Sequence, residues 1–239
     1  MKTKNKALLL TLCAVALAVS SALGTMAYLT DRDAVTNTFT IGNVGLTLDE
    51  ADVRTDGSYE TDHEKRVQEN EYRLIPGHTY IKDPTVTVGA GSADAYVRML
   101  VKVEGMDQLK RAIPNDGTTA RYYGADENKT FLLQKLCVDE NGTYTWDGNT
   151  WKFHNYAESE DGKTGTYEFR YKEVVSKSAN DTVLPDLFTR ITVPGEIDNE
   201  RLGYLKDVKI VVNAHAIQAD GFETADAAWE AFDNQNEKR

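Results

Sequence analysis

The stretch Ala95-Tyr-Val-Arg-Met-Leu-Val-Lys-Val103 carries a small or aliphatic side chain at every second position. These positions are Ala95, Val97, Met99, Val101 and Val103. Successive side chains of a β-strand point to opposite faces of a sheet, so a period of two is typical of a strand with one buried face. The stretch therefore predicts a long strand whose odd-numbered residues face the core.

The same alternation recurs towards the C-terminus, and a shorter strand is expected after Pro84. One inward set is Tyr167, Phe169, Tyr171 and Val175, and another is Val208, Ile210, Val212, Ala214 and Ala216. Near the start of the chain, Phe39 and Ile41 fall on one parity, whereas Val44, Leu46 and Leu48 fall on the other. We expect a bulge or bend at Gly42-Asn43 between them.

Helical patterns are few. Ala225, Ala228, Trp229 and Phe232 follow helical spacing behind a possible N-cap at Thr224, and Met106–Ala112 can form a second short helix. Residues 49–71 are polar without periodicity, and we expect a loop there. Many short strands without alternating helices predict an all-β fold, a jelly-roll-like antiparallel β-sandwich with a few short helices. An open sandwich leaves sheet edges that must be covered.

The N-terminus has the parts of a secretory signal peptide. Three lysines precede the apolar run Ala7–Val19, and small residues permit cleavage after Ala22 or after Ala27. We place the cut between Ala27 and Tyr28, which makes 1–27 the signal. An uncleaved anchor is the alternative, because the uncharged run from Ala7 to Thr30 is long enough to span a bilayer.

Cleavage would change the net charge from −11 to −14, because the signal contains three lysines and no acidic residue. Such an acidic chain disfavours nucleic acids and anionic lipids as partners. Only Cys137 would remain, so no internal disulfide and no cysteine metal cluster can form. Residues 28–239 suit a single domain, in which about 104–185 elaborates a more regular frame.

The sequence offers no recognisable active site. His63-Glu64 begins a zinc-protease helix motif, but Val67 stands where the second histidine belongs. The acidic runs at Asp31–Asp33 and Asp139–Asn141 lack the alternating carboxylates of a calcium loop. We therefore predict a protein that is not an enzyme and has no cofactor and no metal site.

Three stretches resemble the TasA/camelysin family of Gram-positive biofilm-matrix proteins. They are Gly24-Thr-Met-Ala-Tyr-Leu-Thr-Asp31 with Asn37-Thr-Phe-Thr-Ile-Gly-Asn-Val-Gly-Leu-Thr-Leu48, then Leu74-Ile-Pro-Gly-His-Thr-Tyr-Ile-Lys-Asp-Pro84, and Ala216-Ile-Gln-Ala-Asp-Gly-Phe222. The similarity covers roughly residues 20–103 and 188–232. It implies processing by the dedicated signal peptidase SipW, just before an aromatic residue such as Tyr28.

The resemblance also implies a jelly-roll subunit of secreted, extracellular matrix or cell-surface fibres, polymerised by donor-strand exchange. The donor would be residues 28–40, with Tyr28, Leu29, Val35 and Phe39 as apolar anchors. Its partners would be further copies of the chain or related matrix subunits, with no membrane contact after cleavage. The alternatives are a monomeric surface adhesin or binding module and, through camelysin, a metalloendopeptidase.

Overall fold

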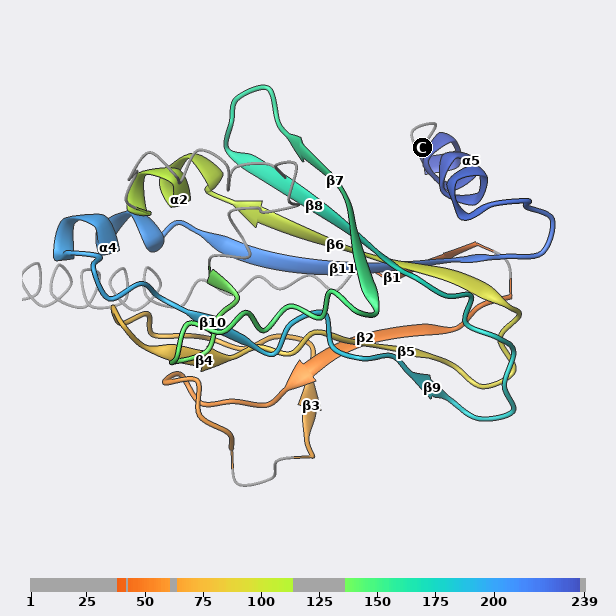
Figure 1. The fold of residues 1–239 in the computed structure, drawn as a ribbon, viewed down its shortest axis with the longest axis horizontal. Coiled ribbons are helices and arrows are strands. Elements are labelled where there is room, and N and C mark those ends of the chain that lie inside the picture. Colours follow the sequence, from red (N-terminus) through yellow and green to blue (C-terminus); the bar gives the residue numbers. More distant parts are fainter. Residues whose placement is uncertain (1–37, 42, 61–63, 114–135, 237–239) are drawn as a thin grey trace, which may run out of the picture. The chain divides into compact units, whose positions relative to one another are not determined.

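The computed structural model describes residues 38–41, 43–60, 64–113 and 136–236, all within the compact unit Ala34–Arg239. Two β-sheets form two layers, as Figure 1 shows. One sheet has the order β1-β11-β6-β8-β7 and the other the order β3-β2-β5-β9, with a two-stranded β10-β4 pair beside them. The predicted β-sandwich with short helices is confirmed.

The strands of the larger sheet are β1 (Thr38–Ile41), β6 (Ala95–Glu104), β7 (Trp151–Glu158), β8 (Thr164–Tyr171) and β11 (Lys209–Gln218). The others are β2 (Leu46–Ala51), β3 (Arg66–Val67), β4 (Thr79–Ile81), β5 (Thr85–Val88), β9 (Thr182–Val183) and β10 (Arg190–Thr192). The helices are α2 (Met106–Ala112), α4 (Asn199–Leu205) and α5 (Ala225–Asn236). β7 and β8, from the 104–185 segment, are integral strands of the larger sheet.

One antiparallel ribbon runs through both layers. It starts at Glu104–Thr164 between β6 and β8, passes the Ala95–Val175 bridge, and continues as the β5–β9 and β4–β10 pairs. The main-chain bond from Gly77 N to Val193 O, 2.8 Å long, ends it. A long ribbon folded across two sheets is what gives a sandwich its jelly-roll character.

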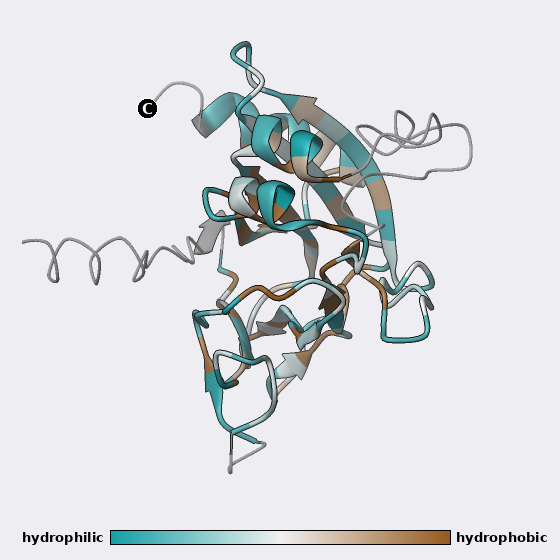
Figure 2. Ribbon diagram, turned by 90° about the vertical axis from the view of Figure 1, so that its left-hand side faces the viewer, coloured by the Kyte–Doolittle hydropathy of each residue, from teal (hydrophilic) through white to brown (hydrophobic). Residues whose placement is uncertain are grey.

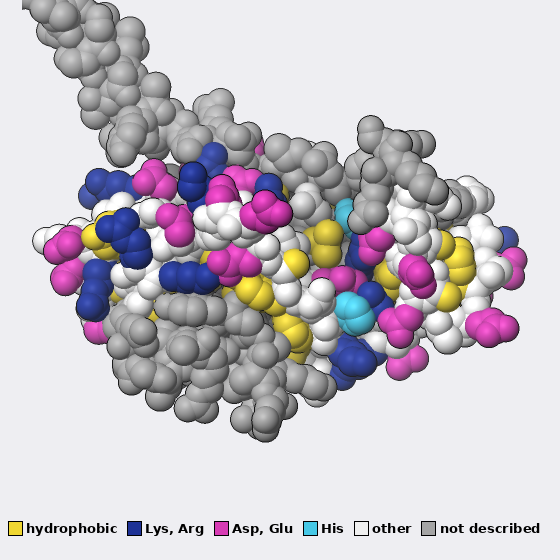
Figure 3. All heavy atoms as spheres, turned by 90° about the horizontal axis from the view of Figure 1, so that it is seen from above, with side chains coloured by type: hydrophobic (Ala, Val, Ile, Leu, Met, Phe, Trp, Pro, Cys, Tyr) yellow, Lys and Arg dark blue, Asp and Glu magenta, His cyan; other side chains and the backbone are white. Residues whose placement is uncertain are grey.

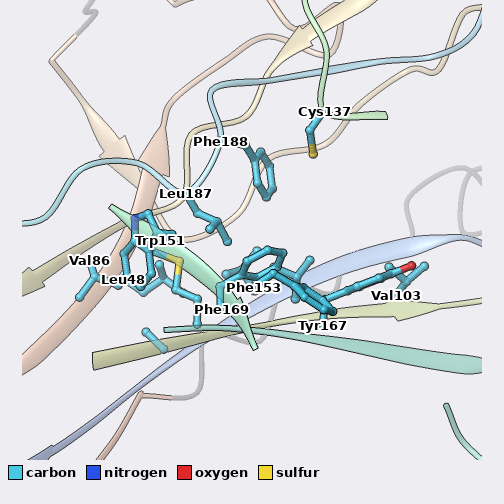
Figure 4. Packing of buried hydrophobic residues seen from close by; sticks show 14 of the residues in the cluster. Leu48, Val86, Val103, Cys137, Trp151, Phe153, Tyr167, Phe169, Leu187 and Phe188 are labelled. Carbon is cyan, nitrogen blue, oxygen red and sulfur yellow. The ribbon is translucent and has the colours of Figure 1, made fainter. Parts of the chain in front are cut away.

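The core lies between the layers, where the hydrophobic segments of Figure 2 concentrate. All five odd-numbered residues of β6 from Ala95 to Val103 are at most 1% exposed, which confirms the predicted inward face. Trp151 on β7 lies near Leu48 and Val86 of the facing sheet, while its indole N–H donates to Pro185 O at 2.9 Å (Figure 4). The two sheets thus share one apolar interior.

Both predicted helices form. α2 has the expected bounds, and Thr224 caps α5 by accepting a hydrogen bond from Ala227 N at 3.2 Å. Helix α4 was not predicted; it is capped by Asp198, whose carboxylate accepts from Arg201 N at 2.9 Å. α2 and α4 pack together, and the Arg111 guanidinium lies 4.0 Å from the Tyr204 ring centre.

The expectation of a loop over residues 49–71 was wrong in part. This region contains the end of β2, the Val53–Tyr59 bridge and β3. Its order comes from side chains rather than from periodicity: Arg66 makes ion pairs of 2.8 and 2.7 Å with Asp49 and Asp83. The change of parity near Asn43 marks the passage of the chain from β1 in one sheet to β2 in the other.

Candidate functional site: the β1–β11 edge

β1 is an edge strand of the larger sheet, and its pairing with β11 is the one parallel pairing among the described strands of that sheet. Thr38 to Ile41 run parallel to Ala214 to Ile217 in register, whereas β11, β6, β8 and β7 are joined antiparallel. β11 is held on its other side by β6 over ten residue pairs. β1 is therefore an addition to an antiparallel frame that does not depend on it for its strand order.

β11 is apolar on its inner face, and two residues of its outer face are also apolar and buried. Val212, Ala214 and Ala216 face the core, while Val211 and Ile217 on the opposite face are 8% and 1% exposed. Apolar residues on both faces are typical of strands that are covered from both sides. The other outward residues of β11 are Lys209, Asn213 and His215, so only part of its outer face has the composition of an interior strand.

β2 lies close to β11 on this flank of the sandwich. Between them is a hollow of about 20 Å³, lined mainly by Leu48, Pro84, Ile210 and Val212, with Glu50 and Lys82 also contributing. One water needs roughly this much room, whereas small-molecule sites enclose about 300–1,000 Å³. The hollow is suited to side-chain packing rather than to a small ligand.

The structure describes one of the predicted site residues. Phe39 lies in β1, with its backbone opposite His215 of β11. Ala27, Tyr28, Leu29 and Val35 lie outside the described residues. The intramolecular β1–β11 pairing is the arrangement of a strand bound to its own chain.

A charged cluster on the outer face of the same sheet was missed by sequence reasoning. Arg98 of β6 is 3% exposed beneath α5. Its guanidinium donates to both carboxylate oxygens of Asp233, with Nη1 to Oδ2 at 3.1 Å, and its Nε donates to His215 Nδ1 at 3.2 Å. Its centre also lies 4.5 Å from the Trp229 ring centre.

Further contacts complete this cluster. Arg170 of β8 pairs with Glu168 at 2.6 Å and with Asp226 of α5. The His215 ring stacks on Phe232, with ring centres 4.9 Å apart and planes 23° apart. Figure 3, which views this side, shows histidine side chains among basic and acidic ones. Two ion pairs and one small apolar cluster, centred on Ile217, Trp229 and Phe232, therefore hold α5 to the sheet.

The environment of His215 predicts acid sensitivity. Burial, and then the charge of Arg98, lower the pKa of His215 to about 4 from an ordinary 6.5. Because the folded pKa is the lower one, the unfolded chain takes up the proton first, and stability falls as the pH drops from 6.5 towards 4.

We expect His215→Gln to reduce the loss of stability below pH 6.5. Urea unfolding at pH 7, 5.5 and 4.5 would measure the free energy of unfolding of both proteins. Asp233, Glu168, Asp226, Arg170 and His154 also face this region, and all five remain in the variant. If the free energy of unfolding changes equally with pH in the wild type and in His215→Gln, the role given to His215 is contradicted.

Within the described ranges no three His, Cys, Asp or Glu side chains could jointly hold a metal ion, and no described helix is long and apolar enough to cross a membrane. The Asp139 carboxylate accepts from Asn141 N and Thr143 N at 2.8 and 2.9 Å, so it stabilises a turn.

Comparison with known proteins adds no relative. No family model, no curated protein and no solved structure matches this chain.

Proposed function

We propose that the chain is a secreted structural subunit of extracellular matrix fibres, joined head to tail by its N-terminal strand after signal removal. The observation that carries the proposal is β1, a parallel edge strand near the N-terminus, outside the antiparallel frame. A strand in that position can leave its own chain without disturbing the order of the other strands, and a neighbour's strand can take its place.

The register of β1 indicates how a donated strand would bind. Continued backwards, the offset between Thr38 and Ala214 would place Val35 opposite Val211. Each main-chain hydrogen bond contributes about 0.5–1.5 kcal/mol net, so a strand of about eight to ten residues can hold a neighbour firmly. The contact uses different surfaces on the two copies, and such contacts propagate into filaments when they do not close.

Export processing would control the step. Before cleavage by a SipW-like peptidase, Tyr28 is tethered to the apolar segment behind it, and strand donation is blocked. We expect protein beginning at Tyr28 to form filaments, whereas a matched chain beginning at Gly24 stays monomeric. Electron microscopy and light scattering would measure this difference. If both proteins stay monomeric at high concentration, self-assembly is wrong.

A cysteine exchange tests which chain supplies the strand. In a Cys137→Ser background, Asn37→Cys and Asn213→Cys are introduced into separate proteins, since the β1 register, continued back by one residue in a donated strand, would place these positions opposite each other. After mixing and oxidation, strand exchange predicts a mixed disulfide dimer on a non-reducing gel. The double variant in one chain is the control, because pairing within the chain gives a cross-linked monomer. Absence of mixed dimers in filaments would exclude this register.

The pairing of β1 with its own β11 favours a second candidate, a monomeric surface adhesin or binding module. In that case the strand stays in its own chain after correct processing. The mature protein would then remain a monomer, and the double cysteine variant would cross-link only within one chain.

A further inference from the structure

Three side chains with complementary chemistry meet on the inner side of β2. Glu50 is 5% exposed and accepts two hydrogen bonds, one on each carboxylate oxygen. Lys82 Nζ donates to Oε2 at 2.7 Å, and Asn70 Nδ2 donates to Oε1 at 2.9 Å. Lys82 follows β4 and Asn70 follows β3, so one carboxylate holds together an amine and a carboxamide from two segments of chain.

The Asn70 carboxamide is held by hydrogen bonds at both its nitrogen and its oxygen. Its Nδ2 also donates to Ala51 O at 2.8 Å, and its Oδ1 accepts from Val53 N at 2.9 Å. The second of these bonds matters chemically, because a backbone N–H that points at a carbonyl oxygen stabilises negative charge developing there. The Asn70 carbonyl is therefore both immobilised and polarised.

The Lys82 amine is largely removed from solvent. The Lys82 side chain is 12% exposed, and its Nζ lies 5.7 Å from the centre of the Tyr72 ring. Leu48, Pro84, Ile210 and Val212 line the adjacent hollow. Lysine is rarely so buried, and here its Nζ is held against one carboxylate rather than free in solvent.

We infer that Lys82 and Asn70 form an intramolecular isopeptide bond, with Glu50 as the proton carrier. Glu50 takes a proton from the Lys82 ammonium, and the free amine attacks Cγ of Asn70. The C–N bond between Nζ and Cγ forms, and the negative oxygen of the tetrahedral intermediate faces Val53 N–H. Glu50 then protonates Nδ2, the Cγ–Nδ2 bond breaks, and the departing ammonia takes the second proton of Nζ and leaves as ammonium. The step needs no oxidant and no further reactant.

The arrangement has the components that such a reaction requires. The nucleophile and the electrophile are held by the same group, which removes the cost of bringing them together. The carboxylate is within proton-transfer distance of both nitrogens, which suits a general base that later acts as an acid. The product would close a ring from Asn70 to Lys82 that contains β4, in a chain whose only cysteine after residue 27 is Cys137. The inference stands apart from the proposed fibre assembly.

The test is the intact mass of the purified protein together with a tryptic map. We expect a loss of about 17 Da, one ammonia, relative to the sequence. Trypsin cannot cleave after an acylated Lys82, so residues 67–73 should appear joined to residues 74–98. The map also separates this product from ammonia loss by succinimide formation at Asn141-Gly142.

Three variants make the result specific. Lys82→Arg keeps the positive charge but removes the nucleophile, and Glu50→Gln keeps the size but cannot carry the proton; both should show the full sequence mass. Lys65→Arg is the matched control, since Lys65 pairs with Asp52 at 2.6 Å on the surface nearby, and it should keep the loss. Full mass in folded wild-type protein would overturn the inference, as would a loss that persists in Lys82→Arg.

Discussion

Gly105→Ala should be among the most destabilising single substitutions in this protein, lowering the free energy of unfolding by about 3–5 kcal/mol. Gly105 precedes α2 with φ of 73°, a left-handed conformation that costs other residues about 1–2 kcal/mol. A Cβ there would also lie 2.3 Å from Asp207 O and 3.2 Å from Val208 Cα. These are backbone atoms beside the start of β11, so they cannot move aside as a flexible side chain could.

Gly142→Ala separates the two contributions. Gly142 has nearly the same φ, 77°, but no atom lies within 4 Å of the position a Cβ would take. We expect this variant to lose only about 1–2 kcal/mol, the conformational cost alone. Urea unfolding of the two proteins side by side gives the comparison. Equal losses would mean that the contact with Asp207 is relieved without cost.

Arg98→Met should loosen α5 and lower the free energy of unfolding by about 2–4 kcal/mol. Methionine retains much of the aliphatic bulk, but it cannot pair with Asp233 or Glu168 or donate to His215. It also removes the cation from the rings of Trp229 and Phe232, which lie 4.5 and 5.0 Å from the guanidinium carbon. The apolar cluster under α5 is small and separate from the main core, so among the described residues the helix would be held mainly by that cluster and the Arg170–Asp226 pair.

The measurement is urea unfolding, combined with limited proteolysis of the segment that joins β11 to α5. Lys102→Ala on the same strand is the matched control. Lys102 pairs with Glu104, and each of the two side chains is 40% exposed. Exposed pairs of this kind contribute about 0–1 kcal/mol to stability. If Arg98→Met behaves like this control and its α5 resists protease, the buried guanidinium does not hold the helix.

Sequence reasoning succeeded where burial follows a period. The alternation in β6 and β8 gave the inward faces of the central strands, and the spacing of Ala225, Trp229 and Phe232 gave the buried face of α5. These signals are local, because each residue's burial is set by its own strand or helix. These signals suffice to predict a β-sandwich with a helix near the C-terminus.

The rest depends on contacts between distant residues. Arg98 sits at an outward position of β6, where the alternation predicts exposure, and only its partners on α5 explain its burial. Residues 49–71 have no period, so the order that Arg66 and Asn70 impose on them is invisible in the sequence. The parallel direction of β1 could not be predicted either, because hydrophobic patterns carry no information on strand direction.

The pairing of β1 has a consequence for the timing of folding. Thr38 finds its partner at Ala214, 176 positions further along the chain. Since a polypeptide is made from its N-terminus, β1 exists long before β11 has been synthesised, and contacts between such distant segments form slowly. During that interval the first strand is committed to no sheet. If copies of the chain exchange strands as proposed, binding to a finished neighbour would compete with closure onto the strand's own molecule, and a higher local concentration of neighbours would favour exchange.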